Sequence, residues 1–212
     1  MVVSGGELPP LPRAGDVPRG VPVIAADGGL EYAQALGLEV TTAVGDLDSV
    51  DAHVVTSAGF AGTRVLRHPA EKDATDLELA LDVALELRPA RILVLAGGGG
   101  RLDHLLGGLL LLGSPRYAEA QLDAIVGAAR VHVVRGERVV AGEPGRLISL
   151  LALHGPAENV TTEGLRYPLA GETLEPGSTR GISNVFTSRT ARIHVARGVL
   201  AAVIPDDTET SA

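Results

Sequence analysis

The sequence contains no cysteine and no tryptophan, and only 2% of its 212 residues are aromatic. The absence of cysteine excludes disulfide bonds, thiolate catalysis and cysteine-bound metals. So few aromatic side chains disfavour recognition of nucleic-acid bases by stacking. The formal net charge of -8 also disfavours binding to a nucleic-acid backbone. An acidic protein can nevertheless bind phosphates when a metal ion lies between the two.

Long apolar runs are absent too. No run reaches the ~18 residues that a membrane-spanning helix requires. The sequence start, MVVSGGELPP, lacks the basic segment and long apolar segment of a signal peptide. We therefore predict a cytoplasmic protein that binds neither a membrane nor nucleic acid. The apolar fraction of 45% is enough for a substantial core.

Apolar runs alternate with helical patterns over the first two thirds of the chain. Runs rich in Val, Ile and Leu are typical of strands, and Leu and Ala at helical spacing predict helices. The predicted strands are 21–26, 41–45, 63–68 and 91–96, and the predicted helices are 30–38, 74–87 and 101–112. This alternation predicts an α/β domain over residues 1–130, with a parallel sheet covered by helices.

The pattern changes near residue 130. Short runs rich in β-branched residues follow, separated by Gly, Pro and Asn, at 131–136, 138–142, 146–153, 159–165, 191–198 and 199–204. Their regular spacing predicts an antiparallel β domain over residues 131–212. The polar tail 205–212 is expected to be frayed.

Acidic residues follow the predicted strands or precede the predicted helices. They are Asp27 in ADGG, Asp46 and Asp48 in GDLDS, Asp73 and Asp76 in EKDATD, and Asp103 in GGRLDH. The carboxyl ends of parallel strands line one crevice, so these side chains are expected to meet there. Crowded carboxylates require a shared cation or partial protonation. Mg²⁺ takes oxygen ligands and usually arrives with a substrate phosphate, so the motifs predict a magnesium site.

Each acidic motif also has a purely structural interpretation. Asp27 before two glycines is typical of a turn. Asp46 and Asp48 fit a turn at a strand end as well as they fit a pair aimed at one ion. Asp73 fits a helix N-cap, with Asp76 in the first helical turn. Capping and metal binding are compatible, because both place a carboxylate at the start of a helix.

Four consecutive glycines, Gly97, Gly98, Gly99 and Gly100, lie between a predicted strand and a predicted helix. Bare backbone amides at a helix start bind anions, although glycine also serves any awkward turn. The run lacks a G-K-[ST] ending and a G-x-G-x-x-G frame, which excludes a Walker-type site and a dinucleotide fingerprint. Arg101 then supplies a planar cation for phosphates. The lone His104 is interpreted as a positioning group rather than a catalytic base.

Six motifs, in order ADGG, GDLDS, EKDATDLELAL, GGRLDH, TTEGLRYPL and GISN, resemble the thiamine pyrophosphokinase family. The resemblance extends from about residue 20 to residue 204. It implies an α/β nucleotide-binding catalytic domain followed by a β-sandwich thiamine-binding domain. It also implies a homodimer, with thiamine bound between the α/β domain of one subunit and the sandwich of the other. The implied reaction transfers the pyrophosphoryl group of ATP to the thiamine hydroxyl, giving thiamine diphosphate and AMP.

The resemblance assigns the acids to a metal site. Asp46 and Asp48 match the family's paired acids that hold magnesium, and Asp73 and Asp76 match the acids that complete that site. Asp27 matches the acid of the first motif and is assigned to the substrate. One of Asp73 and Asp76 is expected to accept the proton of the thiamine hydroxyl, and the choice between them stays open.

The resemblance also assigns substrate-binding residues. Arg101 and Asp103 match the phosphate-side arginine and its neighbouring acid. Ser183 and Asn184 match the serine and asparagine near the thiamine ring. Tyr167 lies where relatives often have tryptophan.

The sequence departs from the family pattern at three points, the first of which is the absence of tryptophan, so that stacking on thiamine must use Tyr167, Phe186 or aliphatic side chains. Gly108 stands where relatives commonly have asparagine, and only residues 1–4 are available for a first strand. Three other functions stay open. They are a pyrophosphokinase for a hydroxymethylpterin, a phosphohydrolase with Asp46 as nucleophile, and a non-catalytic sensor of thiamine or nucleotide. The thiamine-side motifs argue against the first, and the intact acids argue against the sensor.

Overall fold

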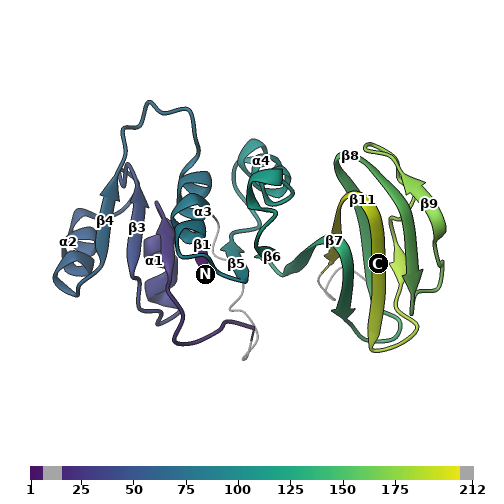
Figure 1. Cartoon of the computed structure of the whole chain (residues 1–212). Helices are drawn as coiled ribbons and strands as arrows, with labels where there is room; N and C mark the ends of the chain where they lie inside the picture. Colours follow the sequence, from purple (N-terminus) through teal and green to yellow (C-terminus); the bar gives the residue numbers. More distant parts are fainter. Residues whose placement is uncertain (7–15, 206–212) are drawn as a thin grey trace. The chain divides into compact units, whose positions relative to one another are not determined.

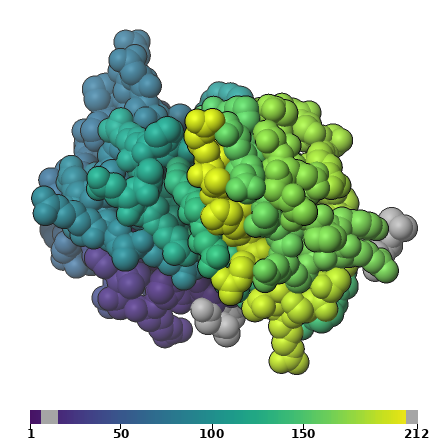
Figure 2. Space-filling view, turned by 45° about the vertical axis from the view of Figure 1, so that its right-hand side comes forward, coloured from purple at the N-terminus to yellow at the C-terminus, as the bar shows by residue number. Residues whose placement is uncertain are grey.

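The structure of the chain is a computed structural model, and it describes residues 1–6 and 16–205. These residues form two compact units, the first drawn mainly in purple to teal and the second mainly in green to yellow (Figures 1 and 2). The first unit comprises Met1–Gly108 and Ala124–Ala128, and the second comprises Leu109–Asp123 and the described residues from 129 onward. The domain boundary near residue 130 stays a prediction. Except for Pro205, the predicted tail lies outside the described residues.

The first unit contains a parallel sheet, as the alternation of runs predicts (Figure 1). Residues 1–4 do supply the first strand, although they are few. The strands are β1 (Val2–Ser4), β2 (Ile24–Ala26), β3 (Thr42–Gly45), β4 (Arg64–Arg67) and β5 (Arg91–Ala96). They pair in parallel in the order β5-β1-β2-β3-β4. All of them therefore end at the same edge of the sheet.

Helices connect these strands. They are α1 (Gly29–Ala35), α2 (Ala52–Phe60), α3 (Asp76–Glu86) and α4 (Leu102–Leu112). The sequence interpretation missed α2, of which only Val55 and Ala58 are buried, too few to produce a helical apolar pattern. Asp73 is not the N-cap of α3, because the Thr75 side chain accepts a hydrogen bond from the Glu78 N–H.

Both faces of the parallel sheet are covered. Val3, Ala25 and Ala43 are aligned on one face and are buried with side chains of α1 and α2. Ile24 and Val44 alternate with them onto the other face and are buried as well, and α3 packs against β1, β2 and β3. Burial on both faces explains why these strands read as continuous apolar runs.

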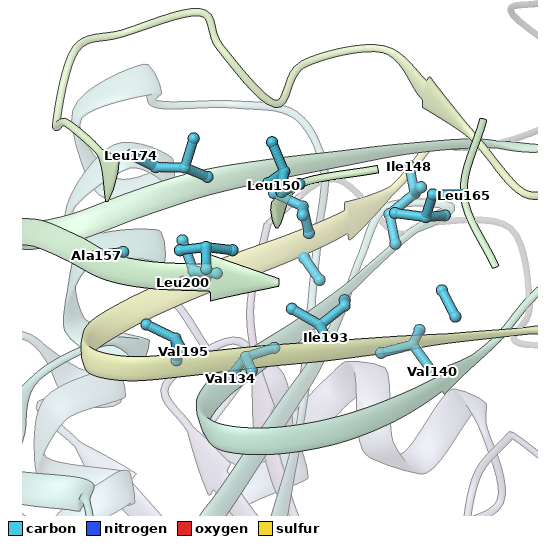
Figure 3. Packing of buried hydrophobic residues seen from close by; sticks show 14 of the residues in the cluster. Val134, Val140, Ile148, Leu150, Ala157, Leu165, Leu174, Ile193, Val195 and Leu200 are labelled. Atoms are coloured by element: carbon cyan, nitrogen blue, oxygen red, sulfur yellow. The ribbon is translucent and has the colours of Figure 1, made fainter. Parts of the chain in front are cut away.

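The second unit is an antiparallel β sandwich, which agrees with the predicted fold class. Its strands are β7 (Ala129–Ala141), β8 (Leu147–Glu163), β9 (Ala170–Leu174), β10 (Asn184–Val185) and β11 (Thr190–Ile204). β11 pairs with β7 and β8, and β8 pairs with β9 and β10. Its core includes Leu150, Ile193 and Leu200, whose side chains gather between the strands in Figure 3.

Several separate runs of the sequence interpretation are halves of one strand. Gly136 within β7 and Gly198 within β11 have φ of 73° and 95°. The register of β11 against β7 shifts between Val195 and Leu200. A glycine with positive φ inside a strand marks a bulge, which bends the strand without ending it. Two further segments escaped the sequence interpretation, β6 (Gln121–Val126) and the 3-10 helix Pro115–Tyr117.

Within the described parts of the chain, no helix combines the length and the apolarity needed to cross a bilayer.

Asp123 is a buried charge in the second unit, with a side chain only 2% exposed. Its Oδ1 lies 2.7 Å from His132 Nδ1 and accepts a second hydrogen bond from Arg138. Burial alone would raise the pKa of Asp123, but the hydrogen bonds and charges of His132 and Arg138 outweigh burial and lower it. A carboxyl group whose pKa is lower in the folded state stabilises the fold above its unfolded-state pKa.

Replacing Asp123 with alanine is expected to lower the free energy of unfolding by about 3 kcal/mol at pH 7, because Arg138 loses its buried counter-charge. This difference should shrink as the pH falls through the folded-state pKa of Asp123. Urea unfolding at pH 7 and at acidic pH measures both effects. Glu158→Ala is the control, since it removes only the exposed ion pair with Arg197 and should change stability by less than about 1 kcal/mol. Equal losses in the two variants would contradict a stabilising role for Asp123.

Candidate active site

Asp27, Asp46 and Asp48 meet at the carboxyl edge of the parallel sheet. Each offers a carboxylate oxygen within 4.8 Å of the other two. β2 and β3 are neighbours, and the Asp27 N–H donates a 2.9 Å hydrogen bond to the carbonyl of Val44. The expected convergence of the first two motifs is therefore observed in the structure.

The GDLD segment turns sharply at the end of β3. Leu47 has a φ of 58° and a side chain that is 4% exposed, within the core of the first unit. A left-handed backbone is costly for a leucine, and burial of its side chain offsets that cost. Anchoring Leu47 inward leaves the carboxylates of Asp46 and Asp48 at the sheet edge.

Gly45 lets a further acid approach the same edge. A Cβ at this position would lie 2.9 Å from Oδ1 of Asp76 and 3.4 Å from Cβ of Asp27. Its φ of 144° is also one that other residues rarely adopt. A glycine at the end of β3 therefore leaves room for the carboxylate of Asp76, the first residue of α3, next to the same backbone position that Asp27 contacts.

The carboxylate of Asp27 is only partly satisfied within the protein. Its Oδ2 accepts a 2.6 Å hydrogen bond from the hydroxyl of Ser49. Its Oδ1 is buried and has no hydrogen-bond partner among the described residues. A buried carboxylate oxygen without a donor is unfavourable, and a cation would satisfy it. Three converging carboxylates with one such oxygen fit a hard, oxygen-binding cation such as Mg²⁺.

The pKa values of the two acids of GDLD, Asp46 and Asp48, are shifted in opposite directions. A 3.3 Å hydrogen bond from the Asp48 N–H is the largest cause that lowers the pKa of Asp46, and Lys72 adds to it. The negative charge of Asp46 is the largest cause that raises the pKa of Asp48, with a smaller contribution from Asp27. Such mutual repulsion is what a shared cation relieves.

Lys72 lies within this group of acids, and the sequence interpretation did not single it out. Its Nζ lies 3.4 Å from Oδ2 of Asp46 and 3.0 Å from Oδ1 of Asp76. The contact with Asp76 is an ion pair outside hydrogen-bond geometry, since that oxygen makes no hydrogen bond within the described structure. Asp73, by contrast, is exposed and is not among the three acids that converge.

Arg101 and Asp103 form an exposed pair after β5. Arg101 Nε lies 3.2 Å from Oδ1 of Asp103, and Arg101 Nη2 lies 2.6 Å from Oδ2. This bidentate hydrogen bonding lowers the pKa of Asp103 to about 2, so the carboxylate stays ionised at neutral pH and fixes the guanidinium. His104 follows in α4 and is exposed.

The glycine run also lies at the carboxyl edge, but away from the acids. Three strand spacings separate β5 from β3, or about 14 Å. Gly100 has a φ of 86°, and a Cβ at Gly98 would lie 2.9 Å from Cα of Gly127. Close approach of the neighbouring backbone therefore accounts for the missing side chain at Gly98 without a ligand. The structure does not place Arg101 or Asp103 among the converging acids.

In the second unit, Asn184 holds the backbone of Tyr167. Asn184 is 3% exposed. Its Oδ1 accepts a 3.0 Å hydrogen bond from the Tyr167 N–H, and its Nδ2 donates a 2.7 Å hydrogen bond to the Tyr167 carbonyl. Tyr167 itself is 54% exposed. The backbone N–H of Ser183 donates to Ser149 Oγ at 3.1 Å, and Ser183 is exposed with a φ of 57°. Asn184 thus positions Tyr167, a role that the sequence alone does not indicate.

The chain combines an α/β unit, which has acids at the carboxyl edge of its parallel sheet, with an antiparallel β sandwich. These features define a class of two-unit α/β proteins with a carboxylate site suited to a cation. The comparisons specify the family. "Thiamin pyrophosphokinase, catalytic domain" matches residues 21–123, and "Thiamin pyrophosphokinase, vitamin B1 binding domain" matches residues 130–200. The chain belongs to the thiamin pyrophosphokinase family.

Individual relatives agree with this family. Thiamine pyrophosphokinase of Bacillus subtilis (strain 168) is 31% identical over 179 residues, which cover 84% of each chain. A crystal structure of the B. subtilis protein superposes with a TM-score of 0.81 at 27% identity, covering 97% of this chain and 98% of that one. The thiamin pyrophosphokinase structure from Geobacillus thermodenitrificans gives a TM-score of 0.80 at 30% identity, covering 99% of each chain.

Proposed function

We propose that this chain transfers the pyrophosphoryl group of ATP to the hydroxyl of thiamine, with Mg²⁺ as cofactor, giving thiamine diphosphate and AMP. Membership of the family supports the acceptor and the type of reaction. The observation that carries the metal requirement is the convergence of the Asp27, Asp46 and Asp48 carboxylates within 4.8 Å.

Two separate groups of residues at the carboxyl edge would bind the nucleotide, the acids after β2 and β3 and the glycine run after β5. Asp46 and Asp48 would hold Mg²⁺, which supplies charge neutralisation to the phosphate oxygens during transfer. Asp27, which the resemblance assigns to the substrate, would join them as a metal ligand, because its carboxylate converges with theirs. The amides of Gly97, Gly98, Gly99 and Gly100 offer donors to the phosphates, and Arg101, oriented by Asp103, offers a planar cation. Asp76 stays a candidate ligand, and Asp73 and Asp76 stay candidate acceptors of the thiamine proton. His104 stays a candidate positioning group beside the phosphates.

The second unit supplies the binding residues for thiamine. Tyr167 offers an exposed ring for stacking against the substrate. Ser183, which directly precedes Asn184 in the sequence, offers a hydroxyl group. The family resemblance supports a homodimer in which each thiamine lies between the α/β domain of one subunit and the sandwich of the other. Sedimentation equilibrium tests the dimer, and a strictly monomeric active protein would contradict it.

Asn184→Ala is expected to raise the KM for thiamine about tenfold with a smaller change in kcat, because Tyr167 loses two hydrogen bonds to its backbone. Steady-state kinetics with thiamine as the varied substrate measures the effect. Tyr167→Phe is the matched control, since it keeps both the ring and the backbone contacts and should leave KM nearly unchanged. An unaltered KM in Asn184→Ala would contradict a role for Tyr167 in binding thiamine.

The decisive assay incubates the purified protein with ATP, Mg²⁺ and thiamine and quantifies thiamine diphosphate and AMP. Both products should form together in equal amounts, and EDTA should stop their formation. A parallel reaction with a hydroxymethylpterin should give no product. Pyrophosphoryl transfer to the pterin instead of thiamine, or a phosphorylated Asp46 trapped from ATP, would overturn the proposal. So would thiamine binding with no release of AMP.

A further inference from the structure

Lys72 is the only lysine of the chain, and the other residues among its 18 lysines and arginines are all arginines. Its side chain is only 14% exposed. Its Nζ lies 3.4 Å from Oδ2 of Asp46 and 3.0 Å from Oδ1 of Asp76. The single lysine ammonium group of the chain is thus placed between a residue of the candidate metal site and the first residue of α3.

The choice of lysine over arginine has a physical consequence. An ammonium group is a compact point charge whose rotatable donors reach several acceptors and can be redirected. A guanidinium group binds one carboxylate through two parallel hydrogen bonds, as Arg101 binds Asp103. A lysine can therefore bridge two carboxylates and still release one of them.

Lys72 also engages one carboxylate oxygen of Asp46, a residue of the candidate metal site. Asp46 Oδ1 accepts a hydrogen bond from the Asp48 N–H at 3.3 Å, and Asp46 Oδ2 accepts one from Lys72 Nζ at 3.4 Å. Both oxygens of Asp46 are engaged within the protein, whereas Asp27 Oδ1 has no hydrogen-bond partner there. A divalent cation that binds Asp46 through Oδ2 therefore meets the ammonium group of Lys72 at the same oxygen, and one that binds through Oδ1 still lies close to that positive charge.

We propose that Lys72 is a positioning residue that serves as an internal counter-cation. It ties Asp46 to Asp76 and weakens the hold of the acids on a free divalent cation, so that the cation enters together with the triphosphate. The negative phosphates then compensate the charge that the metal adds and accept the donor that Asp46 releases. This inference rests on the proposed function only in naming a nucleotide triphosphate as the partner of the cation.

The first test measures Mn²⁺ binding without nucleotide, by the electron paramagnetic resonance signal of free Mn²⁺. Lys72→Met removes the charge but keeps an unbranched side chain, and it is expected to bind Mn²⁺ about tenfold more tightly, the effect of one unit charge a few ångströms away. Loss of a purely structural contact would weaken binding instead. Unchanged or weaker Mn²⁺ binding in Lys72→Met would overturn the proposal.

Two variants control for charge. Arg64→Met makes the same change in net charge, but Arg64 begins β4 at the opposite edge of the sheet, so Mn²⁺ affinity should stay within about twofold. Lys72→Arg retains the charge and should not tighten Mn²⁺ binding. Equal tightening in Arg64→Met would show that overall charge, and not the position of Lys72, sets the affinity, and it would overturn the proposal.

The wild-type protein provides a test that does not depend on the folding of a variant. Protein labelled with ¹⁵N at the lysine side chain contains one Nζ, so one ammonium signal reports on Lys72. Two samples contain the same Mg²⁺ concentration, chosen so that the protein is saturated when a non-hydrolysable ATP analogue is also present. Mg²⁺ alone should leave the chemical shift of the signal unchanged, and Mg²⁺ together with the analogue should change it. A full shift with Mg²⁺ alone would overturn the proposal.

The outcome is separable from that of the proposed function. If the wild type forms no thiamine diphosphate but Lys72→Met still binds Mn²⁺ more tightly, the proposed reaction fails and the counter-cation role stands. If thiamine diphosphate forms but Mn²⁺ affinity is insensitive to Lys72, the reaction stands and the counter-cation role fails.

Discussion

Replacing Asp46 with asparagine is expected to reduce kcat for thiamine diphosphate formation by about a thousandfold or more, with little change in the melting temperature. Asparagine has the same shape and keeps an oxygen that can accept the hydrogen bond from the Asp48 N–H. It loses the charge that holds Lys72 and that a divalent cation requires. Removing one preorganised electrostatic contact to a transition state typically costs ~10²–10³ in rate, and loss of the cation costs more.

The measurement is product formation at saturating ATP, Mg²⁺ and thiamine, with circular dichroism to follow thermal unfolding. Asp51→Asn is the matched control, because Asp51 lies close by in sequence and its side chain caps α2 through the His53 N–H. Asparagine caps a helix about as well as aspartate, so this variant should keep nearly full activity. Wild-type turnover in Asp46→Asn would exclude a catalytic metal at Asp46.

The meeting of distant acids could be predicted because it depends on topology. Asp27 and Asp46 each follow a strand of a parallel sheet, and neighbouring parallel strands end at the same edge. Asp73 lies in a loop before α3, where no strand determines its direction, and the structure leaves it exposed. The strand rule thus predicts convergence only for residues that directly follow a strand.

The contribution of Lys72 could not be predicted from spacing. The residue that holds Asp46 lies 26 positions away, and nothing in the EKDATD motif shows which way its side chain points. Its status as the only lysine was visible in the sequence and was the available signal. Asn184 is a similar case, since its contacts with Tyr167 bridge 17 positions and depend on the pairing of strands in the sandwich.

The glycines were the least predictable residues, because one residue type serves different physical needs. Gly136 and Gly198 read as strand ends but are bulges within long strands. Gly98 reads as part of a phosphate-binding run, and a close contact with the backbone of Gly127 already requires it. Only the structure distinguishes positive φ, close backbone contact and ligand access as reasons for a glycine.

Gly29 is the strongest case of close backbone contact, and Gly29→Ala is expected to cause the largest loss of stability of any conservative change discussed. Gly29 is buried at the start of α1. A Cβ there would lie 2.1 Å from the carbonyl oxygen of Val3 and 2.7 Å from its carbon. Neither atom belongs to a side chain that can rotate away, so α1 must separate from β1. Overpacking of a rigid core costs ~1–3 kcal/mol and occasionally more, and we expect at least about 3 kcal/mol here.

Urea unfolding measures this loss, and Gly59→Ala is its matched control. Gly59 lies in α2, and a Cβ there would have no neighbour within 4 Å. Alanine is favoured over glycine in a helix by roughly 0.5–1 kcal/mol, so this control should be more stable than the wild type. The same substitution thus has opposite signs at two helical positions, because Val3 lies against one of them and solvent against the other. A Gly29→Ala protein as stable as the wild type would contradict the packing of α1 on β1, and with it the placement of Asp27 just before that helix.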